Sequence, residues 1–198
     1  MIEHQSRWTE IEARRVHYLI EGEESGRAVV LLHGASFNAE TWHEIGTMKA
    51  VSDAGNFVCA VDLPGHGKSS PSLGTPRTWL RVLLDILKIE RPVIVSPSMS
   101  GRFSLPLVTE DPQRVSGFVA VAPVGISQYQ QALNRITVPV LAVWGENDRT
   151  IPLEQADLLV NSVKQGRKVI IPGGSHAPYM SDPEAFHAEL LKFLGELP

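Results

Sequence analysis

The chain has 198 residues, 43% of them hydrophobic, so it can bury a substantial core and is expected to form one domain over residues 1–198. Its net charge of -4 arises from acids and bases scattered along the chain, without the basic run that phosphate binding requires, so nucleic acid is not an expected partner. No stretch reaches the roughly 18 apolar residues of a membrane span, and the N-terminal segment "MIEHQSRWTEIEARR" has no features of a secretory or transit signal. The single cysteine, Cys59, cannot form an internal disulfide, and together these features predict a cytoplasmic protein that does not contact membranes.

The first predicted element is an antiparallel hairpin at a sheet edge, in the polar, alternating segment "RWTEIEARRVHYLIEG" of residues 7–22. Short apolar and β-branched runs then recur between helical segments, which is typical of an α/β fold with a mainly parallel sheet and helices on both faces. Most runs do not alternate, as expected for strands covered on both faces. The predicted strands are Ala28–Leu32, Phe57–Val61, Val93–Val95, Gly117–Val121, Val140–Trp144 and Lys168–Ile171.

Two helices can be recognised from their periodicity and end signals. Between Trp79 and Ile89, leucines at positions 80, 83, 84 and 87 mark one helical face, and the segment ends just before Pro92. The last helix is predicted to open at "SDPE", residues 181–184, which offers a capping box and a proline in the first turn.

The stretch "VIVSPSMSG" contains a candidate nucleophile, Ser98, between a buried strand and a helix predicted to begin near Gly101. A sharp strand-to-helix turn would expose one side chain above the sheet edge, and its strained backbone requires small residues two positions to either side. The usual pattern is G-x-S-x-G, and here Ser96 and Ser100 replace both glycines. Serine is small enough to meet this steric requirement. Ser96 is predicted to point into the surroundings of the strand, and Ser100 to enter the first helical turn.

A serine hydroxyl needs a base, which an acid must hold in one tautomer. The strand "VLAVW" runs into a loop containing Asp148, and "KVII" runs into a loop ending at His176. Both loops are predicted at the carboxyl ends of the strands, where open α/β sheets build their sites, and the order serine, acid, histidine is that of α/β-hydrolases. Glu146 is the rival acid, but it directly follows Gly145 and has less freedom to reach His176.

An acyl-transfer site also needs two backbone N–H groups directed at the developing negative charge. The strand before His33 and Gly34 places the N–H of Ala35 as one candidate, and the N–H of Met99, directly after Ser98, is the other. Four further residues follow strand ends near the expected site and are predicted to line an acyl pocket: Phe37, Val124, Ile126 and Tyr179.

Five segments are similar, in order and over nearly the whole chain, to the α/β-hydrolase superfamily: "LLHGASFNAETW", "VDLPGHGKSS", "SPSMSG", "VWGENDRTIP" and "GGSHAPYMSDPEAF". Within it, the short chain and the "SPS-x-SG" elbow followed by "SLP" resemble the alpha/beta-hydrolase domain-containing protein 14 family of small lidless serine hydrolases. The resemblance implies Ser98 as nucleophile, Asp148 as orienting acid and His176 as base, with Ala35 and Met99 forming the oxyanion hole. It also implies structural roles for His33 and His66.

The segment between two consecutive predicted strands, Val124–Thr137, is too short for the lid that is commonly inserted at this point. No cap domain is therefore expected, and an open, shallow site suits short acyl groups.

Other site chemistries fit the sequence poorly. "GHGKSS" resembles the end of a phosphate-binding loop, but Asp62 stands where the first glycine is required. No group of histidines and carboxylates has a convincing metal-ligand spacing, so neither a metal nor a cofactor is expected. The histidines His4, His17, His43 and His187 are predicted to be solvated or packed.

The leading hypothesis is therefore a serine hydrolase that cleaves small carboxylic esters, with a small acyl compound as its partner. A second hypothesis keeps the acyl-enzyme but passes the acyl group to a thiol such as coenzyme A, as an acyltransferase or amide deacylase. A third is a non-catalytic protein-binding module on a hydrolase fold. Cofactor-free peroxidation of acids, which uses a similar triad, is a fourth.

Overall fold

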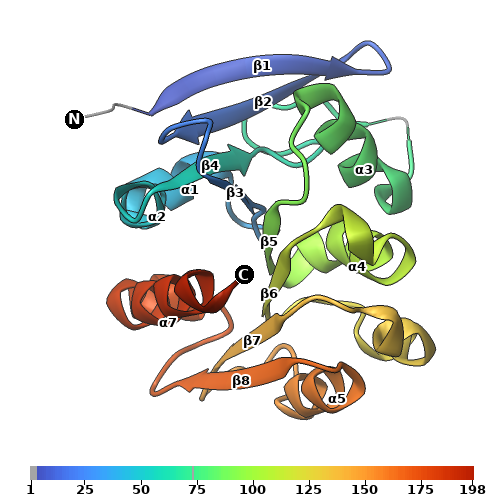
Figure 1. Cartoon of the computed structure of the whole chain (residues 1–198), viewed down its shortest axis with the longest axis vertical. Coiled ribbons are helices and arrows are strands. Elements are labelled where there is room, and N and C mark those ends of the chain that lie inside the picture. Colours follow the sequence, from blue (N-terminus) through green and yellow to red (C-terminus); the bar gives the residue numbers. More distant parts are fainter. Residues whose placement is uncertain (1–3, 73) are drawn as a thin grey trace.

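The computed structural model describes residues 4–72 and 74–198, which form an eight-stranded sheet of order β1-β2-β4-β3-β5-β6-β7-β8 (Figure 1). The pair β1 and β2 is antiparallel, and β2 also runs antiparallel to β4, whereas β4, β3, β5, β6, β7 and β8 are parallel neighbours. The strands are Gln5–Ile11 (β1), Arg14–Glu21 (β2), Arg27–Leu31 (β3), Asn56–Val61 (β4), Val93–Pro97 (β5), Gly117–Val121 (β6), Val140–Gly145 (β7) and Gly166–Ile171 (β8). The predicted α/β fold with an antiparallel edge hairpin is confirmed.

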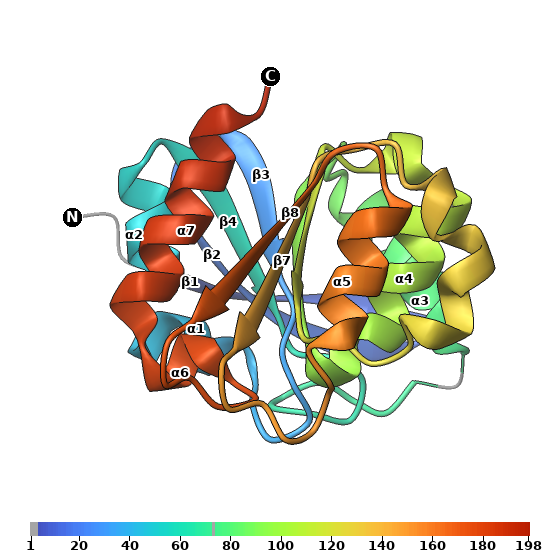
Figure 2. The ribbon, with the colours of Figure 1, turned by 90° about the horizontal axis from the view of Figure 1, so that it is seen from below.

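Helices cover both faces of this sheet (Figure 2). One face packs against Ala39–Glu44 (α1), Thr47–Asp53 (α2), Pro178–Ser181 (α6) and Pro183–Glu196 (α7), and the other against Pro76–Leu87 (α3), Gly101–Glu110 (α4) and Glu154–Ser162 (α5). Only the short 3-10 segment Ser127–Arg135 lies between β6 and β7, and the described residues contain no cap domain. None of the described helices has the length and apolar character needed to cross a bilayer.

The predicted strands agree with the observed ones within two residues at each end. The ends of the helices depend on local signals that periodicity alone does not show. Helix α3 begins at Pro76, three residues earlier than predicted, because a proline fits the first turn. It ends at Leu87 because Lys88 adopts a left-handed backbone with φ 54°. Helix α7 begins as predicted, with the Asp182 carboxylate accepting a hydrogen bond from the Ala185 N–H at 3.0 Å.

Asp62, just after β4, joins three segments of the chain. Its carboxylate is 2% exposed and contacts His17 Nδ1 on β2 at 2.7 Å. It also accepts hydrogen bonds from the backbone N–H groups of Ala39, at the start of α1, and of Lys68. A buried carboxylate is stable only when it is paired and hydrogen-bonded. Asp62 therefore fixes the loop after β4 and the start of α1 relative to the edge hairpin.

Replacing Asp62 with alanine should lower the free energy of unfolding by about 3 kcal/mol, because the buried His17 ring, the buried Ala39 N–H and the partly buried Lys68 N–H lose their acceptor. The measurement is urea unfolding followed by circular dichroism. Asp53→Ala is the matched control, because Asp53 pairs only with Lys49 on an exposed helix surface and its loss should hardly move the unfolding midpoint. Equal effects of the two substitutions would contradict this role of Asp62.

Candidate active site

Ser98 occupies a sharp turn between β5 and α4. Its φ is 49°, in the left-handed region that non-glycine residues rarely adopt, and the turn Ser98–Ser100 then leads directly into α4. Such a backbone persists only where the surroundings hold it. Here the N–H of Val124 donates to the Ser98 carbonyl at 2.9 Å, which fixes the turn against the loop after β6. The half-buried Ser98 side chain therefore stands at the carboxyl edge of the sheet, as predicted.

The serines that replace the usual glycines form a buried hydrogen-bonded cluster. Ser96 Oγ lies 2.9 Å from Ser100 Oγ and 2.7 Å from Ser104 Oγ, and Ser100 also donates to the Pro97 carbonyl. All three hydroxyls belong to side chains with no exposed surface. They link the end of β5 to the first turns of α4, so they do more than satisfy a requirement for small size. Ser104 was not predicted; its spacing of four residues from Ser100, one helical turn, is the signal that could have revealed it.

His176 lies between Ser98 and Asp148. Its Nε2 is 2.8 Å from Ser98 Oγ, and its Nδ1 is 2.9 Å from Asp148 Oδ2. The Asp148 side chain is fully buried, and its other oxygen accepts hydrogen bonds from the N–H groups of Thr150 and Ile151 at 2.8 and 3.0 Å. A carboxylate held in this way accepts the Nδ1 proton and leaves Nε2 free to accept the serine proton. The structure thus brings all three predicted residues together in the order that nucleophile activation requires.

The rival acid Glu146 has a different partner. Its carboxylate accepts a hydrogen bond from the Gly173 N–H at 2.8 Å, and it makes none with His176. This contact joins the loop after β7 to the loop after β8. The loops are also close at Gly145, where a β-carbon would collide with the Ser175 carbonyl oxygen. Glu146 and Gly145 therefore set the separation of the two loops that bear Asp148 and His176.

His33 orients the peptide group between Gly34 and Ala35, in the loop after β3. The buried His33 Nε2 accepts a hydrogen bond from the Leu63 N–H at 2.9 Å, so Nδ1 carries the proton and donates to the Gly34 carbonyl at 2.8 Å. Burial lowers the pKa of His33, which keeps the ring in this neutral form. Because a trans peptide directs its C=O and N–H to opposite sides, the Ala35 N–H points away from His33. It makes no hydrogen bond with the described residues.

The second predicted donor, the N–H of Met99, belongs to the first turn after Ser98 and so has no helical acceptor. Met99 directly follows Ser98 in the chain, and Gly34, which precedes Ala35, lies beside the Ser98 side chain.

The predicted pocket residues separate into two groups. A β-carbon placed on Gly34 would contact Phe37 Cδ2 at 3.5 Å, Ser98 Cβ at 3.6 Å and the Tyr179 hydroxyl at 3.6 Å, so these three side chains surround one spot beside the nucleophile. Val124 contacts Ser98 through its backbone. Ile126, in contrast, has no exposed surface and packs in the core on the α3 side of the sheet, so it does not line the open site.

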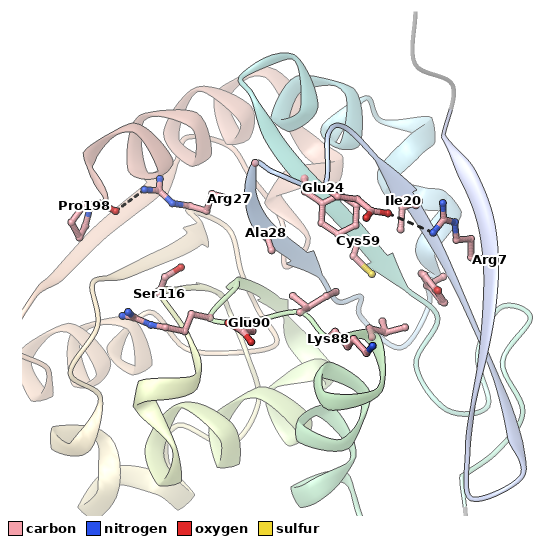
Figure 3. Close-up of a pocket in the computed structure, with 16 residues that line it drawn as sticks. Arg7, Ile20, Glu24, Arg27, Ala28, Cys59, Lys88, Glu90, Ser116 and Pro198 are labelled. Carbon is pink, nitrogen blue, oxygen red and sulfur yellow. Dashed lines mark hydrogen bonds and ion pairs between the residues drawn. The ribbon is translucent and has the colours of Figure 1, made fainter.

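A cavity of about 760 Å³ lies at the opposite end of the sheet (Figure 3). It is lined by residues at the amino ends of strands, such as Ala28 and Phe57, and by the segment after α3. It contains none of Ser98, Asp148 and His176, which belong to loops at the carboxyl ends. Cys59, on the floor of this cavity, has its pKa raised to about 12 by burial, so its thiol is not a second nucleophile.

Restoring the first glycine of the usual elbow should destabilise this protein. Ser96→Gly removes the hydroxyl that joins Ser100 to Ser104, and we expect a loss of about 1–3 kcal/mol in the free energy of unfolding. Denaturant unfolding of wild type and variant measures the loss. Ser25→Gly, in an exposed loop, controls for the added backbone freedom. A neutral or stabilising Ser96→Gly would show that the serine cluster serves only to fill space.

An α/β sheet with serine, acid and histidine loops at its carboxyl edge defines the α/β-hydrolase class, and comparison with known proteins agrees. Residues 27–127 match the family model described as alpha/beta hydrolase fold, and residues 98–181 match a serine hydrolase (FSH1) model. The chain belongs to the α/β-hydrolase family and, within it, to the ABHD14 proteins.

Two relatives support the assignment to the ABHD14 proteins. Mouse Protein ABHD14A is 37% identical over 86% of this chain and 71% of its own length. Human ABHD14B, whose name proposes that it is a protein-lysine deacylase, is 35% identical over 87% of each chain. Among solved structures, a predicted CIB-like hydrolase from Thermoplasma acidophilum superposes with a TM-score of 0.93 at 26% identity, covering 98% of this chain and 99% of that one.

Proposed function

We propose that the protein hydrolyses small carboxylic esters through an acyl-enzyme formed on Ser98. The observation that carries this proposal is the position of His176, whose two ring nitrogens lie 2.8 Å from Ser98 Oγ and 2.9 Å from Asp148 Oδ2. A serine hydroxyl with a base at this distance can lose its proton as it attacks a carbonyl carbon. The buried Asp148 carboxylate then stabilises the imidazolium that forms.

The same groups would catalyse the remaining steps of ester hydrolysis. The carbonyl oxygen becomes an oxyanion, which the N–H groups of Ala35 and Met99 are placed to bind. His176 returns the proton to the departing alcohol oxygen as the carbon–oxygen bond breaks, which leaves the acyl group on Ser98. Water then attacks this ester with His176 again as base, and the acid and free serine are released.

The size of the acyl group is limited by what surrounds Ser98. No cap domain is present in the described residues, so the site is not closed over from above. Phe37 and Tyr179 lie beside Gly34 next to Ser98 and restrict the space there. Short acyl chains therefore fit better than long ones.

Ser98→Ala should reduce ester turnover by about 10⁴-fold or more, and Asp148→Asn by about 10³–10⁴-fold. The measurement is hydrolysis of a chromogenic ester series from acetate to decanoate, with acetate to butyrate the preferred range. Glu146→Gln is the control for Asp148→Asn. The glutamine amide oxygen can still accept the Gly173 hydrogen bond that joins the two loops, and Glu146 makes no hydrogen bond with His176, so this variant should retain most of the wild-type rate.

Circular dichroism establishes that each variant is folded. Full activity in Ser98→Ala, or equal losses in the two acid variants, would overturn the assignment. Inactivity of the folded wild type on every ester would instead favour acyl transfer to a thiol or the protein-binding module.

A second candidate is transfer of the acyl group from an amide, such as an acylated lysine, to a thiol. Two observations favour it: the open site leaves room for a peptide substrate, and the relative ABHD14B has a name that proposes protein-lysine deacylation. The acyl-enzyme on Ser98 would be the same. His176 would take the proton of the thiol as sulfur attacks the ester carbon, and the products would be a thioester and free Ser98.

An acetyl-lysine peptide incubated with the enzyme and coenzyme A separates the two candidates. If thiol is the natural acceptor, acetyl-coenzyme A should form faster than acetate, and coenzyme A should accelerate release of the free lysine peptide. Chromatography of both products gives the ratio. An unchanged rate and a product that is acetate alone would leave water as the acceptor. Ser98→Ala should abolish both products.

A further inference from the structure

Four titratable side chains converge beside α1, away from the triad. On the sheet side, Gln5 of β1 pairs with Ile20 of β2, so extending this antiparallel ladder by one residue sets His4 opposite Glu21. Residues directly opposite each other share one face of a sheet. Leu19 packs in the core that α1 covers, and Glu21 is two residues further along the same strand. His4 and Glu21 therefore both face α1.

On the helix side, Glu40 and His43 are three residues apart on α1 and thus neighbours on its surface. His4 Nε2 lies 3.9 Å from Glu40 Oε1, and the rings of His4 and His43 have centroids 3.8 Å apart. One ligand atom from each of these three side chains lies within 4.8 Å of the other two. Two imidazoles and a carboxylate from separate segments thus face one small volume.

Glu21, on the sheet side of this group, is a further carboxylate that faces α1. It is 7% exposed, and its side chain makes no hydrogen bond with the described residues. Burial raises the pKa of Glu21, while His43 and His4 are the charged groups that most lower it, ahead of Lys49; Asp53 raises it slightly.

We propose that His4, Glu40 and His43, with Glu21 beside them, bind a divalent ion of the zinc type. Imidazole and carboxylate are ligands that Zn²⁺ binds at about 2.0–2.2 Å, so two atoms 3.9 Å apart leave room for an ion between them. The wider separations need only small side-chain movements, which the exposed His43 can make. The Glu40 carboxylate offsets part of the charge of the ion, and the imidazoles favour Zn²⁺ over Mg²⁺ or Ca²⁺.

A bound ion would connect the segment before β1 to α1. Helix α1 begins at Ala39, directly after the loop that carries Ala35, and none of Ser98, Asp148 and His176 belongs to the cluster. The ion is therefore structural: it stabilises the edge hairpin on α1 and does not enter the reaction. Chelation should lower the unfolding temperature and leave ester hydrolysis at 25 °C unchanged.

The test uses the full chain without a polyhistidine tag, stripped of metal by chelation and dialysis. Titration calorimetry with Zn²⁺ at neutral pH should give one ion per chain. Glu40→Gln and His43→Gln should each weaken binding by at least about tenfold. Glu44→Gln, an exposed acid on the same helix but outside the cluster, is the matched control and should bind as wild type does. Circular dichroism verifies the fold of each variant.

Two further readouts separate this site from adventitious binding. Zn²⁺ should raise the unfolding temperature of wild type and of Glu44→Gln but not of the two cluster variants. Affinity should fall when the solution is acidified, because an imidazole must be unprotonated to bind the ion. Absence of Zn²⁺ binding at concentrations up to about 1 mM would overturn the proposal, because a weaker Kd could not stabilise the fold. Unchanged binding in both Glu40→Gln and His43→Gln would also overturn it.

Discussion

The left-handed backbone at Ser98 is the constraint on which the site depends. A residue with φ 49° is unfavourable unless its neighbours fix it, and this chain fixes it from both sides of the turn. Strand β5 is held between β3 and β6 in the sheet, and Val124 bonds the Ser98 carbonyl. The buried hydroxyls of Ser96, Ser100 and Ser104 tie the strand end to α4. The unfavourable backbone at Ser98 is thus held by a strand paired on both sides and by a buried hydrogen-bonded cluster.

The partners of Ser98 are positioned by contacts between loops. Each of the loops after β7 and β8 is anchored to its own strand, but the distance between them depends on the hydrogen bond from Gly173 to Glu146 and on the close approach at Gly145. The same principle places the loop after β3, where the neutral His33 ring bridges two backbone segments. Residues that do not react with substrate thus determine whether the reacting groups are within hydrogen-bonding distance.

The two ends of the sheet differ in the side chains that they carry. The carboxyl ends carry the serine, histidine and acid loops, whereas the cavity at the amino ends is lined by charged and apolar side chains without a reactive nucleophile (Figure 3). The cluster of His4, Glu40 and His43 lies at a third place, between the edge hairpin and α1. An ion there would stabilise the molecule independently of catalysis, so stability and activity can be measured separately.

The sequence by itself determined the strand positions, the edge hairpin and the loops that bear Ser98, His176 and the two rival acids, because unbroken apolar runs and the polar loops that follow them are local features. Tertiary structure decided the rest. The exclusion of Ile126 from the open site depends on which face of the sheet it packs against, and the choice of Asp148 over Glu146 depends on a contact between two loops. The sequence also gave no reason to expect a metal site. His4 and His43 are 39 positions apart, and only the pairing of two strands and the packing of one helix bring them together.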